Sequence, residues 1–181
     1  MVLQLPFFEI SLPFLIPDYI KLDISDLPAL LAAFTAGPVW GAAVCVIKNT
    51  VHLAFGATGG IGELANALMG VAFVIPAGLI YKYRHNKTGA LIGGSVGAAA
   101  GAVVSFPVNM LITYPFYISV YFGGQVEPLL NTYNKIFGTD LGLTEVLLYF
   151  NLPFTFAKYM LCLAVALLIY KPLSPIFKKF K

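Results

Sequence analysis

Charged residues are scarce in this chain of 181 residues, since only 10% of them are charged and 59% are hydrophobic. Uncharged stretches such as residues 88–126 are too long for a strand or for the core helix of a soluble protein. The long apolar segments also lack the period-two alternation that a transmembrane barrel requires. The sequence therefore excludes a soluble domain and predicts an all-α integral membrane protein.

Cysteine and histidine are equally sparse. Cys45 and Cys162 lie in separate apolar runs without CxxC spacing or histidine companions, so we expect no disulfide and no metal site. The chain has no Gly-x-x-x-x-Gly-Lys-Ser/Thr loop for nucleotide phosphates. The formal net charge of +3 comes mostly from loops and the C-terminal tail, and it does not indicate nucleic-acid binding.

The positions of the few charges predict the topology. Lys82, Arg84 and Lys87 form one basic cluster, and four lysines from residue 171 onward form another; neither contains a carboxylate. Most acidic residues fall in other connecting segments. Because cytoplasmic loops are rich in Lys and Arg, we expect both clusters, and hence the C-terminus, in the cytoplasm. Residues 18–26 and 123–145 are then outside.

The number of membrane crossings that the charges require determines how the apolar stretches divide into helices. An odd number of crossings must separate Asp26 outside from Lys82 inside, which requires a turn at Gly37-Pro38. All segments belong to one transmembrane domain, residues 1–181. They are a short helix at 26–36, longer helices at 38–55, 61–82, 88–118 (with Pro107 as a candidate kink) and 147–171, and an external loop at 123–145 with room for a short helix.

Residues 1–22 are interpreted as the end of a first helix followed by an external loop. Three prolines and Glu9 prevent residues 1–17 from spanning a bilayer by themselves. The segment either begins outside the membrane or is the remainder of a truncated first helix. The second interpretation, which gives a bundle of six helices, is favoured.

Lys158 is the only charge between Val146 and Tyr170, and a charge inside a bilayer usually serves a site. With a helical rise of about 1.5 Å per residue, the other polar residues of the apolar runs reach a similar depth in the outer half of the membrane. Asn151 and Thr155 share one helix face with Lys158. The residues expected to converge on one pocket are Lys48, Glu63, Asn66, Asn109, Thr113, Asn151 and Lys158. Pairing of Lys158 or Lys48 with Glu63 is the structural alternative.

The predicted helix at 88–118 carries small residues at every fourth position, which change to polar ones toward its outer end. The series is Gly89, Gly93, Gly97, Gly101, Ser105, Asn109 and Thr113. Small residues at this spacing allow two membrane helices to approach closely. The glycine half therefore predicts a packing seam, and the polar half predicts a pocket wall.

Four motifs together resemble a known family. They are KLDISDLPAL at residues 21–30, Lys48-Asn49 with His52, TGGIGELAN at 58–66 and PAGLIYK at 76–82. They occur in the same order as in the riboflavin-specific S components of energy-coupling factor (ECF) transporters. The resemblance covers nearly the whole chain except the first helix.

The resemblance implies a six-helix S-component bundle in the bacterial plasma membrane, with riboflavin as a transported ligand and no cofactor or metal. It implies partners as well, namely a transmembrane coupling subunit and two ABC-type ATPases. Asn109 and Lys158 match the family's asparagine and lysine and are expected to contact the flavin ring. Asp26, Lys48, Glu63 and Asn66 lie in family motifs and are expected near the ligand.

Other functions remain as alternatives to the expected role, which is that of a binding subunit and not an enzyme. The chain could be an S component for another vitamin such as thiamine. An integral-membrane enzyme could use Lys158 and Glu63 for acid-base chemistry, but no clustered His, Cys or carboxylate set supports it. A structural assembly subunit held by the glycine seam is a third alternative.

Overall fold

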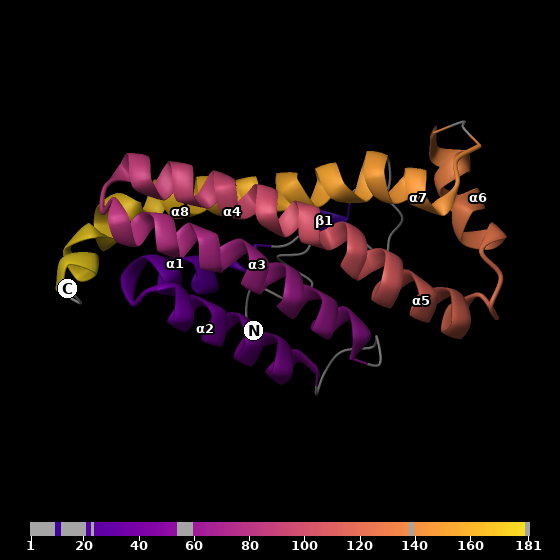
Figure 1. Cartoon of the computed structure of the whole chain (residues 1–181), viewed down its shortest axis with the longest axis horizontal. Helices are drawn as coiled ribbons and strands as arrows, with labels where there is room; N and C mark the ends of the chain where they lie inside the picture. The colour runs from indigo at the N-terminus through magenta and orange to yellow at the C-terminus, as the bar shows by residue number, and fades with distance from the viewer. Residues whose placement is uncertain (1–9, 12–20, 23, 54–59, 138–139, 180–181) are drawn as a thin grey trace.

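A computed structural model of the chain describes all residues except 1–9, 12–20, 23, 54–59, 138–139 and 180–181. The described residues form an elongated bundle of helices (Figure 1). Near the N-terminus, β1 (Ile10–Ser11) and β2 (Lys21–Leu22) pair antiparallel. Both strands lie in the segment that the sequence analysis interprets as the end of a first helix followed by an external loop, and most of residues 1–22 lies outside the described part.

The first three helices follow the breakers in the sequence. α1 (Leu27–Thr35) and α2 (Pro38–Leu53) are joined by Gly37, whose φ of 106° suits glycine far better than any residue with a Cβ atom. The predicted turn at Gly37-Pro38 is therefore confirmed. α3 (Ile61–Tyr83) begins after Gly60, which also has a positive φ.

Two long composite helices complete the bundle. α4 (Lys87–Val108), the π-helix η3 (Asn109–Thr113) and α5 (Tyr114–Tyr121) form one continuous helix. α7 (Leu143–Val146), the π-helix η4 (Leu147–Asn151) and α8 (Leu152–Lys179) form the other. Between them, α6 (Glu127–Phe137) occupies the segment expected to be an external loop.

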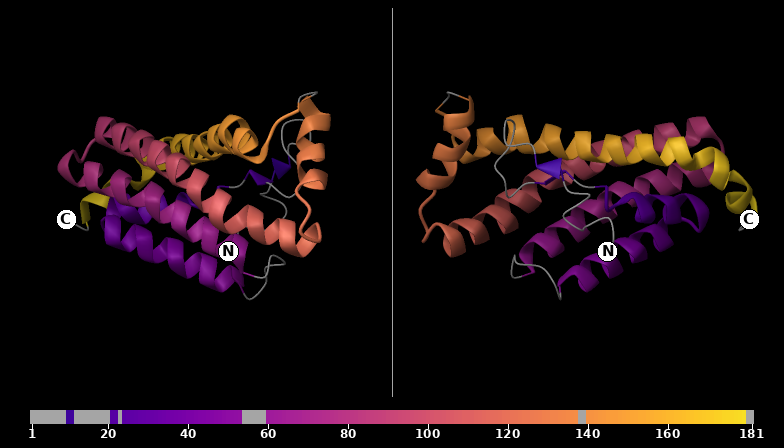
Figure 2. Two further views of the ribbon diagram at one scale, coloured as in Figure 1. Left: turned by 45° about the vertical axis from the view of Figure 1, so that its right-hand side comes forward. Right: turned by 180° about the vertical axis from the view of Figure 1, so that it is seen from behind.

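By length and composition, three helices among the described residues could cross a membrane. They are Ile61–Tyr83, Lys87–Tyr121 and the apolar part of the last composite helix, Leu143–Ile169. The turn between α3 and α4 and the C-terminal part of α8 lie at one end of the bundle, and α6 lies at the other (Figures 1 and 2). Lys82, Arg84 and Lys87 and the lysines of the C-terminal part of α8 therefore belong to the same end.

The two π-helices share a sequence signal that the analysis above did not use. Pro115 follows η3 by two residues, and Pro153 follows η4 by two residues. A proline has no N–H, so the carbonyl four residues earlier, which lies inside each π-helix, has no α-helical partner. A local change to i→i+5 hydrogen bonds is one way in which membrane helices accommodate this loss.

The glycine series of α4 forms the packing seam that the sequence predicts. A Cβ atom added at Gly93 would lie 2.7 Å from the carbonyl oxygen of Ala77 in α3. One added at Gly101 would lie 2.6 Å from Cε2 of Tyr159 in α8. Tyr159 in turn stacks on Phe73 of α3, with ring centroids 4.3 Å apart. The seam fixes α4 between α3 and α8.

Replacing Gly97 by leucine is expected to destabilise the bundle, because a Cβ atom there would collide with the backbone oxygen of Phe73. Overpacking costs about 1–3 kcal/mol, and more where backbone must move. Thermal unfolding in detergent measures the effect. Val96→Leu is the control, because Val96 is 44% exposed on the adjacent face. Equal unfolding temperatures for the two variants would contradict the packing role of Gly97.

Candidate functional site

One face of the last composite helix carries buried polar side chains. Asn151, Thr155 and Lys158 are only 7%, 6% and 9% exposed, and their spacing places them on one side of the helix. The Thr155 hydroxyl donates to the backbone oxygen of Asn151 at 2.9 Å. This polar face connects two groups of hydrogen-bonded residues contributed by the other helices.

The first group, the aspartate cluster, consists of Ser25, Asp26, Lys48 and Lys158. Asp26 precedes α1 and is 2% exposed. The Lys48 ammonium donates to Asp26 Oδ1 at 2.6 Å and to the Ser25 hydroxyl at 2.8 Å. Lys158 Nζ lies 4.0 Å from the other carboxylate oxygen. One carboxylate thus joins the start of α1 to lysines of α2 and α8.

The aspartate cluster corrects one structural expectation. The sequence analysis offers Glu63 as the partner of Lys48, but Lys48 pairs with Asp26. Glu63, which is 5% exposed at the start of α3, instead lies 3.0 Å from Nδ1 of His52. The pairing with Glu63 is wrong for Lys48 because the turn at Gly37 brings α2 back along α1, next to Asp26.

The second group, the asparagine cluster, consists of Asn109, Asn151, Tyr114 and Tyr133. Asn109 Nδ2 donates to Asn151 Oδ1 at 2.9 Å, and Asn151 Nδ2 donates to the Tyr114 hydroxyl at 3.1 Å. The hydroxyls of Tyr114 and Tyr133 share a hydrogen bond of 2.8 Å. All four residues are buried. The cluster ties together η3, η4, α5 and α6.

Two buried polar atoms have no hydrogen-bond partner within the described part of the chain. They are the Thr113 hydroxyl, one turn beyond Asn109, and Oδ1 of Asn49, next to Lys48. Buried polar atoms in native proteins are nearly always bonded, so an unbonded one needs an explanation such as a ligand or an ordered water. The Thr113 hydroxyl therefore marks the same region of η3 that Asn109 occupies.

The structure brings together most of the predicted residues, in two groups instead of one pocket. Asp26, Lys48 and Lys158 form one group, and Asn109 and Asn151 form the other. Thr113 shares η3 with Asn109, and Asn66 lies half-buried three residues after Glu63 on α3. Their contacts with a ligand stay predictions.

Sequence reasoning missed Ser25, Asn49 and the tyrosines of the asparagine cluster. The sequence analysis gives Tyr114 no role, yet it is 2% exposed and bonded to Asn151. The sequence feature that could have indicated a buried Tyr114 is the polar series on the same helix, which ends at the adjacent Thr113. Tyr133 lies in a predicted loop, where a buried side chain could not be anticipated.

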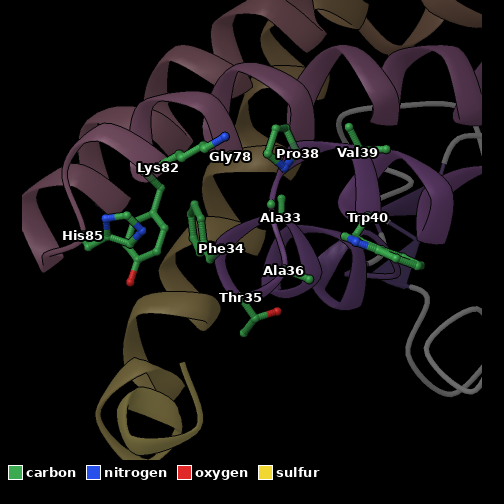
Figure 3. Close-up of a pocket in the computed structure, with 12 residues that line it drawn as sticks. Ala33, Phe34, Thr35, Ala36, Pro38, Val39, Trp40, Gly78, Lys82 and His85 are labelled. Carbon is green, nitrogen blue, oxygen red and sulfur yellow. The ribbon is translucent and has the colours of Figure 1, made fainter. Parts of the chain in front are cut away.

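A cavity of about 500 Å³ lies away from both groups, at the end of the bundle that holds the turn between α3 and α4. Figure 3 shows its wall, which includes Phe34, Trp40, Lys82 and His85. A Cβ atom at Gly78, in this wall, would lie 2.9 Å from Cα of Pro38, so α2 and α3 are in close contact there. This cavity contains none of the predicted site residues.

The chemistry of the two polar groups suits recognition of a polar organic molecule. They offer ammonium and amide donors, amide and hydroxyl acceptors, and apolar walls, which is the usual composition of a small-molecule site. Among the described residues, no three His, Cys, Asp or Glu side chains lie close enough together to hold a metal ion.

Comparison with known proteins identifies relatives. The family model of the ECF transporter substrate-specific component matches residues 1–170. The chain is 30% identical over 175 residues to the riboflavin transporter RibU of Staphylococcus aureus (strain TCH60), covering 97% of this chain and 85% of that protein. It is 32% identical over 105 residues to the riboflavin transporter FmnP of Bacillus subtilis (strain 168), covering 56% and 55%.

The fold has a solved counterpart. A structure described as the S component of a bacterial ECF transporter superposes with a TM-score of 0.71 at 28% sequence identity. The match covers 98% of this chain and 89% of that one. The all-α membrane fold expected from the sequence is thereby confirmed.

Proposed function

Because this chain belongs to the family of ECF transporter substrate-specific components, we propose that it captures riboflavin at the outer face of the bacterial plasma membrane for import. Two of its relatives are named riboflavin transporters. In this role the protein binds and releases a vitamin and catalyses no chemical reaction. Riboflavin is the transported ligand and not a cofactor.

The arrangement of Asn109, Asn151 and Lys158 carries the proposal. The flavin ring is flat and largely apolar, but one edge alternates carbonyl acceptors with an N–H donor. Side-chain amides can match both kinds of group, and an ammonium can donate to a carbonyl or ring nitrogen. Asn109 and Asn151 bond to each other across η3 and η4, and Lys158 lies two turns along from Asn151.

The other predicted residues have supporting roles in this proposal. Asp26 and Lys48 hold Lys158 in place, and the unpartnered Thr113 hydroxyl adds a hydrogen-bonding group beside Asn109. Glu63, paired with His52, holds the start of α3, and Asn66, three residues further along that helix, is assigned a place near the ligand. Each of these contacts is testable by substitution.

ATP-driven import requires partner subunits. The sequence has no phosphate-binding loop of its own, so hydrolysis is assigned to two ABC-type ATPases acting through a transmembrane coupling subunit. Lys82, Arg84, Lys87 and the lysines of the C-terminal part of α8 lie at the same end of the bundle, which favours a cytoplasmic C-terminus. The asparagine cluster then lies toward the outer face.

Absorption and fluorescence of the purified protein test the function directly. Riboflavin added to the detergent-solubilised, flavin-free protein is expected to lose fluorescence on binding, with a stoichiometry of one flavin per chain. Thiamine, in excess, is expected not to compete. Binding of thiamine without any binding of riboflavin would overturn the substrate assignment and leave the family assignment intact.

A further inference from the structure

The cavity of Figure 3 lies where a membrane helix leaves the bilayer. Its wall consists of residues 33–40 together with Gly78, Tyr81, Lys82 and His85. α3, which is long enough to cross a membrane, ends at Tyr83, one residue beyond Lys82. Trp40 in the wall is 63% exposed, and Tyr83 is 86% exposed. Because Trp and Tyr side chains gather at the depth of the lipid headgroups, the cavity borders the headgroups and not the hydrocarbon core.

The wall of the cavity carries cationic side chains and no carboxylate. Lys82 and His85 are both exposed, and in the part of the chain that the structure describes Lys82 has no acidic partner. Residues 27–62 and 64–126, the stretches that supply the whole wall, contain no aspartate or glutamate. The ligand with complementary charge is therefore an anion.

Most of the wall is apolar or aromatic, which narrows the choice of anion. Phe34 and Tyr81 are only 5% and 3% exposed, and their ring centroids lie 4.7 Å apart. Tyr81 also meets the His85 ring edge-on, with centroids 5.4 Å apart. A free phosphate ion would use only Lys82 and His85 and would leave the apolar wall in contact with water. A ligand whose anionic group is attached to an apolar chain matches both parts of the wall (Figure 3).

Close backbone contacts fix the shape of the cavity. Gly37 turns the chain between α1 and α2 with a φ of 106°. A Cβ atom at Gly78 would lie 2.9 Å from Cα of Pro38, so this turn packs directly against α3. A site that is already formed loses less conformational freedom on binding than one that must be ordered by its ligand.

We propose that this cavity binds the phosphodiester headgroup of an anionic phospholipid such as phosphatidylglycerol. The Lys82 ammonium and an N–H of the His85 ring donate to phosphate oxygens, and Trp40 and Phe34 contact the glycerol and the upper part of the acyl chains. Basic pockets between membrane helices recognise anionic headgroups in this way. The inference goes beyond the proposed function, because the cavity lies away from both polar groups and the lipid binds without riboflavin.

Trp40 is the only tryptophan of the chain, so its fluorescence reports directly on the cavity. The flavin-free protein in detergent is titrated with phosphatidylglycerol that carries bromine atoms in the upper part of its acyl chains, because bromine quenches indole fluorescence only at short range. Brominated phosphatidylcholine, which has the phosphate but no net charge, is titrated in parallel. Wild type is expected to prefer phosphatidylglycerol about tenfold, the value of one hydrogen bond between charged groups.

Lys82→Met is expected to weaken binding of phosphatidylglycerol about tenfold and to bring it close to that of phosphatidylcholine. Lys87→Met is the matched control, because it removes the same charge at the same end of the bundle from a residue outside the wall. It should keep the preference of wild type. Both lysines are exposed, so both variants should keep the unfolding temperature of wild type.

Equal quenching of wild type by the two lipids would overturn the proposal. Equal weakening by Lys82→Met and Lys87→Met would do the same, since it would show only a general attraction to the basic end. Displacement of the lipid by inorganic phosphate, but not by chloride at the same ionic strength, would indicate a site for the free anion instead. Riboflavin titration of the same samples keeps the two proposals apart, because protein that binds the lipid and no riboflavin contradicts only the proposed function.

Discussion

Replacing Lys158 by methionine is expected to weaken riboflavin binding by about 10- to 100-fold, which is the value of a hydrogen bond from a charged group. Methionine keeps most of the length and the apolar part of the side chain but has no ammonium. The bundle should still fold, because Asp26 retains its ion pair with Lys48 at 2.6 Å. Fluorescence titration in detergent measures the dissociation constant.

Lys82→Met serves as the control for the loss of charge. Lys82 is exposed at the opposite end of α3 from Glu63, beside the cavity of Figure 3. Its replacement should leave riboflavin affinity unchanged. If Lys158→Met bound riboflavin as tightly as Lys82→Met, the buried lysine would have a structural role only.

Replacing Asp26 by asparagine is expected to destabilise the folded protein by about 3–5 kcal/mol, since breaking a buried ion pair leaves an uncompensated charge. Asp26 and Lys48 have side chains only 4% and 8% exposed, so solvent cannot replace the lost carboxylate. Asn49, next to Lys48 in sequence, offers a buried carbonyl oxygen but no charge. Thermal or denaturant unfolding in detergent measures the loss.

A second substitution separates this charge effect from a change of shape. Adding Lys48→Met to Asp26→Asn removes the nearer of the two ammonium groups that face Asp26, so the double variant should be more stable than Asp26→Asn alone. Asp140→Asn, at an exposed position, should have no effect on stability. If the double variant instead lost as much stability as Asp26→Asn and Lys48→Met lose together, the ion pair would be refuted as the source of the destabilisation.

Local signals predicted the parts of the fold that depend on neighbouring residues. A glycine-proline pair forms the turn between α1 and α2, and small residues at every fourth position of α4 form a close contact with α3. The glycine-proline turn and the spacing of small residues each depend on residues within one turn or helix, so both patterns can be recognised in a single sequence. The buried face of Asn151, Thr155 and Lys158 was likewise evident from helical spacing.

The pairings between helices could not be predicted in the same way. Asp26 and Glu63 are both acidic residues near the start of a helix, and spacing alone does not say which of them meets Lys48. The answer depends on how α1, α2 and α8 pack in three dimensions. Tyr133 illustrates the same limit, because its burial depends on where α6 folds back against α5 and η4.

Because of the two π-helices, the direction in which the candidate site residues point depends on the exact number of residues in each helix. Each holds more than four residues in one turn, so side chains beyond it are rotated by about 100° from where an uninterrupted α-helix would place them. Asn109 begins η3 and Asn151 ends η4, so the pair meets where both helices leave their regular register. Insertion or deletion of a single residue in either segment would therefore turn a different set of side chains toward the candidate site, even with every candidate residue retained.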